Sequence, residues 1–140
     1  MRLALFDLDH TLIPFDSGTA WVQHLISLGL LDPSAQTRHL EFCHQYVAGT
    51  LDIHAMQRSL LAPLAALDPP EIAALREDFA RAMARRLPER MRSLVEMHRA
   101  RGELCAIVTA TQRLIAEPFA QGFGIEHLVA SEAVMHDGRP

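Results

Sequence analysis

The chain has 140 residues, 49% of them hydrophobic and 21% charged, and a formal net charge of −4. This size predicts one globular domain that buries about two thirds of its extended surface, and the negative charge argues against a nucleic-acid-binding role, which usually needs a basic patch. The two cysteines, Cys43 and Cys105, lie far apart and outside any C-x-x-C pattern. We therefore expect neither a disulfide framework nor a zinc cluster, and the reducing cytoplasm is the predicted compartment. The apolar run at the start is too short for a membrane span, so no membrane partner is expected.

The first predicted element is a buried strand over residues 2–6, where a short apolar run ends in polar residues. From residue 17 to about residue 101 the sequence is helical, because apolar residues recur at helical spacing and capping residues mark the ends of each segment. The expected helices cover 17–29, 32–49, 52–67, 68–87 and 88–102. Pro63 is expected to end or kink the third of them.

The pattern changes after residue 103. A second continuous apolar run, "LCAIVTAT" (104–111), predicts a buried parallel strand, and a helix over 112–122 and a short strand, "HLVAS" (127–131), follow it. Alternating strands and helices predict an α/β fold with a Rossmann-like parallel sheet. The helical block is longer than a crossover needs, so residues 16–87 are predicted to form an inserted all-helical cap, and residues 1–15 and 88–140 the sheet core.

The end of the sequence carries two further signals. Asp137–Gly138 predicts a hairpin turn, yet only two residues follow it, so the core is expected to be incomplete at its C-terminus. All 13 basic residues are arginine, and the chain contains no lysine. Either the composition is simply biased towards arginine, or a segment that needs lysine is missing.

The segment "FDLDHTL" places two carboxylates, Asp7 and Asp9, directly after the first strand. Ligands of open α/β sheets bind at the carboxyl ends of strands, and side chains two residues apart in an extended chain point the same way. Two carboxylates in one pocket repel each other, which raises one pKa or recruits a cation such as Mg²⁺. The alternative is structural, with Asp7 capping a turn and Asp9 exposed to solvent.

"FDLDHTL" resembles the first signature of the haloacid dehalogenase-like (HAD) hydrolases, and "AIVTAT" resembles the second. A helical insertion directly after the first signature is similar to the subgroup that contains the phosphoserine phosphatases (subfamily IB). The stretch from residue 107 to 139 is similar to members of that subgroup that dephosphorylate histidinol phosphate. The resemblance implies a Mg²⁺-dependent phosphatase that acts on a small phosphorylated metabolite.

The resemblance also implies a role for each matching residue. Asp7 would attack phosphorus and form an aspartyl-phosphate, and Asp9 would protonate the leaving group and later activate water. Mg²⁺ would lie between the Asp7 carboxylate, the Asp9 backbone carbonyl and the phosphate. The Thr109 hydroxyl and the backbone N–H of Ala110 would bind phosphate oxygens. For Thr109 the structural alternative is a helix N-cap.

Asp16 stands where the phosphoserine phosphatases hold an acidic residue that faces the substrate amine. The resemblance therefore implies an amine-bearing substrate such as histidinol phosphate or phosphoserine. Equally, Asp16 or Ser17 simply caps the helix that follows. The sequence does not predict the oligomeric state.

Two family signatures have no counterpart in this sequence: a lysine that offsets the charge of the phosphate, and a G-D segment with a second aspartate that completes the Mg²⁺ site. Without them Mg²⁺ would be held weakly and the 140 residues alone would catalyse poorly. Our first hypothesis is that the chain is the N-terminal portion of a longer phosphatase. The alternative is a truncated, non-catalytic relative that binds phosphate ligands or a partner protein.

Overall fold

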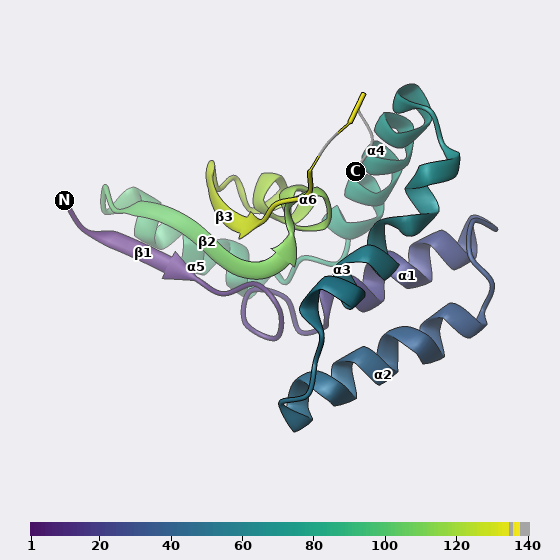
Figure 1. Cartoon of the computed structure of the whole chain (residues 1–140). Coiled ribbons are helices and arrows are strands. Elements are labelled where there is room, and N and C mark those ends of the chain that lie inside the picture. The colour runs from purple at the N-terminus through teal and green to yellow at the C-terminus, as the bar shows by residue number, and fades with distance from the viewer. Residues whose placement is uncertain (135, 138–140) are drawn as a thin grey trace. The chain divides into compact units, whose positions relative to one another are not determined.

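The computed structural model of the protein describes residues 1–134, 136 and 137, and within them it has three strands and six α-helices (Figure 1). A single 3₁₀ segment, η1, follows the third helix. In chain order the elements are β1 (Leu3–Phe6), α1 (Ser17–Ser27), α2 (Ser34–Ala48), α3 (Ile53–Leu61), η1 (Ala62–Ala66), α4 (Pro69–Ala84), α5 (Glu89–Ala100), β2 (Leu104–Gln112), α6 (Arg113–Phe123) and β3 (His127–Ser131).

The predicted fold class is confirmed, since the three strands form one parallel sheet and helices connect them. Each predicted helix and strand is present, with ends that differ by a few residues. Pro63 acts as expected, because α3 ends at Leu61 and the chain continues as the 3₁₀ segment. The predicted hairpin at Asp137–Gly138 lies partly outside the described residues. Asp137 itself has a φ of 51°, a value that such a turn requires.

Contacts divide the chain into two compact units. The sheet unit comprises Met1–Ser17 and Leu75–Ala133, and the helical unit comprises Gly18–Ala74 with the described residues that follow Ala133. The division falls inside α4, whose C-terminal part belongs to the sheet unit. The boundaries predicted from sequence were 16–87 for the helical block, and its role as a cap over a site stays a prediction.

In the sheet unit, β2 is the central strand, with β1 on one side and β3 on the other. Leu3 of β1 pairs with Leu104 of β2, and Ala106 of β2 pairs with His127 of β3. Both pairings are parallel, so the carboxyl ends of the three strands lie at the same edge of the sheet. The residues that follow β1 therefore lie next to the end of β2.

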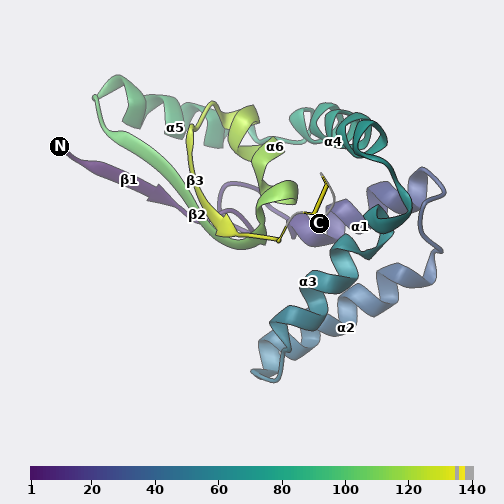
Figure 2. The same cartoon turned by 45° about the horizontal axis from the view of Figure 1, so that its top comes forward.

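The two faces of this sheet differ in what covers them. Ala4 and Phe6 of β1 and Ile107 of β2 lie on one face of the sheet, and all three are buried. Helices α5 and α6 pack against the sheet (Figure 2), and the Phe6 ring contacts His98 of α5. The side chains on the opposite face alternate with them, as expected for strands. Four of these are apolar and 44–62% exposed: Leu3, Leu5, Val108 and Val129.

In the helical unit, Trp21 of α1 connects α1 to α3. The Trp21 side chain is fully buried, and its indole N–H donates a hydrogen bond to the Leu60 carbonyl of α3 (2.9 Å). At the start of α3, Asp52 is the N-cap, and its Oδ1 accepts from the backbone N–H groups of His54 (3.0 Å) and Ala55 (3.1 Å). This arrangement satisfies two of the donors that a helix N-terminus leaves without intrahelical partners.

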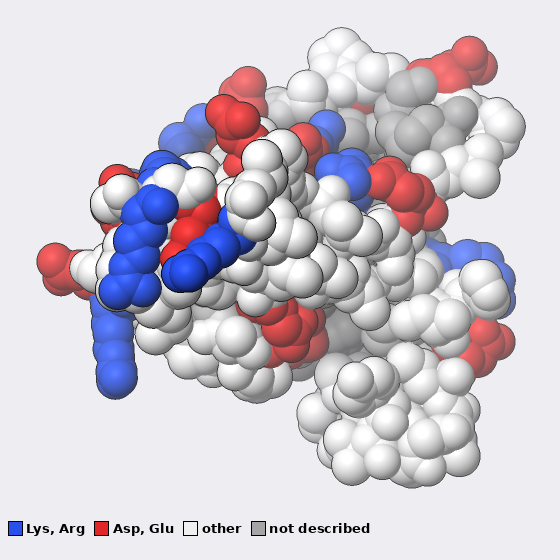
Figure 3. Space-filling model, turned by 90° about the vertical axis from the view of Figure 1, so that its left-hand side faces the viewer, with Lys and Arg blue, Asp and Glu red and all other residues white. Residues whose placement is uncertain are grey.

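Across the described residues, no helix has both the length and the apolar character needed to cross a bilayer. Acidic and basic side chains are interspersed on the face drawn in Figure 3, with uncharged surface between them. This agrees with the scattered arginines of the sequence.

Candidate active site at the carboxyl end of β1

The loop after β1 holds both predicted catalytic aspartates and is fixed by its own apolar residues. Leu8, Leu12 and Ile13 are completely buried, and the backbone N–H groups of Thr11 and Ile13 both donate to the Leu8 carbonyl (3.2 Å each). His10 has a φ of 54°, the left-handed conformation that lets the chain turn back directly after Asp9. Burial and backbone bonding thus hold the two carboxylates at defined positions.

Asp7 is the first residue after β1, and its side chain is exposed. Its Oδ1 accepts a hydrogen bond from the backbone N–H of Leu8 (2.9 Å). A carboxylate that is exposed at the carboxyl end of a parallel strand is open to a ligand from solvent.

Asp9 is held on both of its carboxylate oxygens. Oδ1 accepts from the backbone N–H of Ser17 (2.7 Å), and Oδ2 accepts from the Thr111 hydroxyl (3.0 Å). Burial has the largest effect on the pKa of the Asp9 carboxyl and raises it. The hydrogen bonds from Ser17 lower this pKa, the nearby negative charge of Asp16 raises it, and the hydrogen bond from Thr111 lowers it. The net effect is a raised pKa, so the Asp9 carboxyl keeps its proton to a higher pH than an ordinary aspartate does.

The end of β2 supplies the other side of the site. Val108 pairs with Val129 and Gln112 with Ser131, so β2 uses four residues where β3 uses two, and the pairing is irregular in between. Such bulges redirect side chains. Within this irregular segment the Thr111 N–H donates to the Thr109 hydroxyl oxygen (3.1 Å).

Thr109 and Ala110, both predicted to bind phosphate, lie in this same irregular segment. The Thr109 hydroxyl accepts from the Thr111 N–H and still has its own O–H to donate. The Ala110 carbonyl accepts from the Ser131 hydroxyl (2.7 Å). Asp7 and Asp9 thus follow β1, Thr109 and Ala110 lie near the carboxyl end of β2, and these two strands are neighbours.

Two residues that contact Asp9 directly, Ser17 and Thr111, were not among the predicted site residues. Ser17 is completely buried although polar, and its hydroxyl lies 3.0 Å from that of Thr111. The sequence predicts only a helix-capping role for Ser17. The alternation T-A-T at residues 109–111 was the available signal for Thr111, since it places two hydroxyls two residues apart on one strand.

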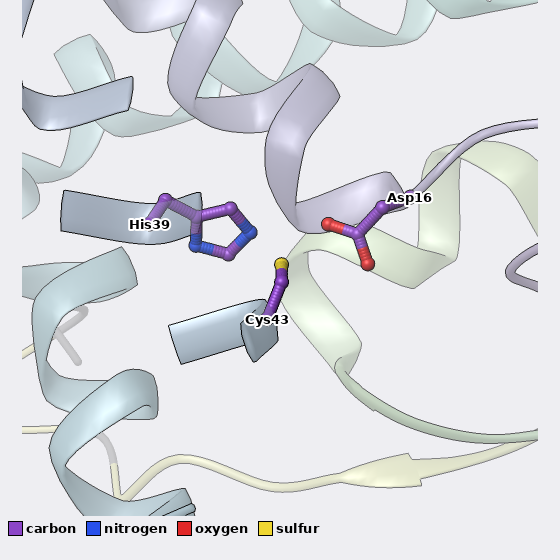
Figure 4. Close-up of side chains that lie close together, drawn as sticks. All are labelled: Asp16, His39 and Cys43. Atoms are coloured by element: carbon purple, nitrogen blue, oxygen red, sulfur yellow. The ribbon is translucent and has the colours of Figure 1, made fainter. Parts of the chain in front are cut away.

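Asp16 precedes α1 and is half-buried, and its negative charge acts on Asp9 within the sheet unit. Figure 4 labels Asp16 together with His39 and Cys43. His39 and Cys43 are four residues apart on α2, so their side chains leave the same face of that helix. They belong to the helical unit, whereas Asp16 belongs to the sheet unit.

A surface hollow of about 470 Å³ lies elsewhere in the sheet unit, between α6 and β3. Arg113 lines it, and the Arg113 guanidinium is bound to Glu132 (2.5 Å) and to the Leu128 carbonyl (2.8 Å). None of the predicted site residues lines this hollow.

Residues 4–139 match the family described as haloacid dehalogenase-like hydrolase. The chain belongs to this family. The resemblance predicted from the two motifs is therefore confirmed, and the HAD match includes Asp7, Asp9 and Thr109.

Individual relatives agree with the family. The chain is 35% identical over 133 residues to a histidinol-phosphatase from Neisseria meningitidis serogroup C (strain 8013), with 94% of this chain and 60% of the relative covered. The chain thus spans about 60% of the length of that curated relative.

Two solved structures share the fold. One is a protein of unknown function from Bordetella pertussis Tohama I, with a TM-score of 0.85 and 40% identity over 99% of this chain and 63% of that one. The other is a phosphoserine phosphohydrolase-like protein from Francisella tularensis subsp. tularensis SCHU S4, with a TM-score of 0.68 and 20% identity over 99% of this chain and 62% of that one.

Proposed function

We propose that the protein is a Mg²⁺-dependent phosphatase that hydrolyses a small phosphomonoester through an aspartyl-phosphate. The observation that carries this proposal is the contrast between the two aspartates: Asp7 is exposed beyond β1, and Asp9 is half-buried, hydrogen-bonded at both carboxylate oxygens and has a raised pKa. A carboxylate that is open to a ligand suits a nucleophile, and a neighbouring carboxyl group that keeps its proton to higher pH suits a general acid. The histidinol-phosphatase relative supports the same reaction class.

In this proposal the Asp7 carboxylate attacks phosphorus, and the bond from phosphorus to the ester oxygen breaks. Asp9 gives its proton to the departing oxygen, which leaves as the alcohol. Asp9, now ionised, takes a proton from the water that attacks the phospho-aspartate, and Asp7 and inorganic phosphate are released. The Thr109 hydroxyl and the Ala110 backbone N–H hold the phosphate oxygens.

The residues present fit Mg²⁺ in a specific way. The Asp7 carboxylate is exposed, whereas each carboxylate oxygen of Asp9 accepts a hydrogen bond and this group is needed for proton transfer. The ion would therefore be held by the Asp7 carboxylate and the Asp9 backbone carbonyl, both oxygen ligands of the kind it prefers. When bound, it would neutralise charge on the phosphoryl group.

For the substrate we propose a phosphomonoester that bears an amine, such as histidinol phosphate or phosphoserine, with Asp16 as the group that binds the amine. Asp16 is half-buried and close enough to Asp9 for its charge to act there. In the protein expressed from its whole reading frame, Asp16→Asn should raise KM for the amine-bearing ester and leave KM for p-nitrophenyl phosphate unchanged. An equal change for both esters would assign Asp16 to the helix cap instead.

The reaction itself is tested with Asp7→Asn in the same whole protein. We expect p-nitrophenyl phosphate hydrolysis with Mg²⁺ to fall by about 10³-fold or more, because the attacking carboxylate is replaced by an amide. The matched control is Asp78→Asn, an exposed acid on α4 that pairs with Arg81, and it should retain full activity. A phosphoryl adduct on the peptide that contains Asp7, detected by mass spectrometry, should accumulate in Asp9→Asn, since water activation is slowed.

Turnover that persists in Asp7→Asn would overturn the proposal. The second candidate is a non-catalytic relative that binds phosphate or a partner protein, and it is favoured by the absence of lysine from the chain. It predicts saturable phosphate binding without turnover in the whole protein, measured by calorimetry.

A further inference from the structure

The half-buried Asp9 carboxyl lies beside a pair of hydroxyl groups to which the proposed reaction assigns no role. Thr111 donates to Asp9 Oδ2 at 3.0 Å, and the Ser17 hydroxyl lies 3.0 Å from the Thr111 hydroxyl. The two residues come from the two separate segments of the sheet unit and lie 94 positions apart in the sequence. Folding alone brings them together.

The direction of these bonds follows from counting protons. A threonine hydroxyl has a single proton. When Thr111 donates that proton to Asp9, the Ser17 hydroxyl has to be the donor to Thr111. The carboxylate of Asp9 is then held at one oxygen by the backbone N–H of Ser17 and at the other by a hydroxyl that is itself oriented by Ser17.

The shape of β2 makes this arrangement possible. Thr111 lies in the irregular segment between Val108 and Gln112, and its own N–H is bound by the Thr109 hydroxyl. A regular strand would continue the pairing with β3 at this point. The irregularity instead brings the Thr111 hydroxyl to Asp9, which follows the neighbouring strand.

From this geometry we infer that Thr111 is a positioning residue for proton transfer by Asp9, and that Ser17 supports it. The inference rests on the proposed phosphatase function. Thr111 does not need to touch the substrate; it fixes the plane of the carboxyl group that gives a proton to the leaving oxygen. Because a hydroxyl can both donate and accept, the contact survives when Asp9 gains or loses its proton.

The test compares two esters that differ in how much they need a general acid. A nitrophenolate leaves readily without a proton, whereas the alkoxide of an alkyl phosphate such as phosphoserine does not. In the whole protein, Thr111→Val should lower kcat for the alkyl ester by about 10²-fold, the lower end of what general-acid catalysis contributes, and lower it far less for p-nitrophenyl phosphate. KM should change little for either ester.

Thr111→Ser is the matched control, because it keeps the hydroxyl and removes only the methyl group; it should restore the alkyl-ester rate. Ser17→Ala keeps the backbone N–H to Asp9 and removes the hydroxyl, so it should show a weaker effect in the same direction. Circular dichroism of each variant checks folding, and Ser17→Ala serves as the test should Thr111→Val not fold.

The outcomes separate this inference from the function on which it rests. Equal losses for both esters in Thr111→Val, or no rescue by Thr111→Ser, overturn the positioning role while Asp7→Asn still shows the phosphatase reaction. A wild-type protein inactive on both esters overturns the phosphatase function and this inference with it.

Discussion

Burial controls the charge of Asp9 more strongly than its hydrogen bonds do, because desolvation is the largest cause of its raised pKa. Asp32, an exposed acid before α2, shows the opposite case: its Oδ1 accepts from the Ser34 N–H (2.9 Å), and hydrogen bonding to Ser34 lowers its pKa. The pKa of an aspartate is thus raised at one place in the chain and lowered at another.

The raised pKa of Asp9 and the lowered pKa of Asp32 predict opposite effects of pH on the free energy of unfolding. The folded state binds the Asp9 proton more tightly than the unfolded state, so the stability contributed by Asp9 is highest at low pH and falls as pH rises through the range above 3.8. Asp9→Asn should therefore gain stability relative to wild type as pH rises through that range. The measurement is urea unfolding at several pH values in the presence of EDTA.

Asp32→Asn provides the matched control with the opposite sign. Because the Asp32 pKa is lowered, its stabilisation is present at higher pH and is lost as pH falls through the range below 3.8. This variant should match wild type at low pH and lose stability relative to it as pH rises. Parallel profiles for the two variants would contradict the assigned directions.

The sequence was sufficient to identify Asp7, Asp9 and Thr109 as candidates, because strand ends and the spacing of side chains are local properties. It was not sufficient for Thr111 and Ser17. Their contact with Asp9 depends on the register of β2 against β3 and on a loop conformation in which His10 adopts a positive φ. Neither feature can be predicted from the spacing of apolar residues, which repeats every two residues in a strand and every 3.6 residues in a helix.

At the scale of elements, the ends of the helices were set by residues whose effect is local. Gly49 terminates α2 with a φ of 74°, a conformation that glycine adopts without strain. Pro63 lies in the 3₁₀ segment that succeeds α3. Such signals were readable in the sequence, whereas the division of α4 between two units was not, because it depends on tertiary contacts.

The N-cap of α3 gives a quantitative expectation. Asp52→Ala removes the acceptor for the His54 and Ala55 N–H groups and should lower the free energy of unfolding by about 1 kcal/mol. Asp52→Asn keeps a good cap and should stay close to wild type. Urea denaturation followed by far-UV circular dichroism measures both. An equal loss in the two variants would show that charge, and not capping, is the important property of Asp52.

At the scale of the whole molecule, the face of the sheet that carries Leu3 and Leu5 is unusual, because several of its apolar side chains are exposed among the residues that the structure describes. Val108 pairs with Val129, Leu3 and Leu5 lie two residues apart on β1, and each of the four is 44–62% exposed. Burying a side chain of this kind is worth about 1.5–3 kcal/mol. Adjacent exposed apolar side chains on a sheet therefore favour any contact that removes them from water.

We expect the 140-residue chain to bind a hydrophobic dye such as ANS and to elute at larger sizes as its concentration rises. The double variant Leu5→Thr with Val129→Thr should reduce both effects, since threonine is compatible with strands but polar. Val47→Thr, at an even more exposed apolar position on α2 (85%), is the control and should behave as wild type. Dye binding that the double variant does not change would place the responsible surface elsewhere.

The pairing of β1 with β2 also has a consequence for biosynthesis. Leu3 meets Leu104, so about 100 residues must be made before the first strand acquires its partner. At about 5–20 residues per second, β1 waits roughly 5–20 seconds on the ribosome. The helices encoded in between form from local contacts on a much faster timescale. Asp7 and Asp9 are therefore synthesised about 100 residues before Thr111, whose hydroxyl completes the environment of Asp9.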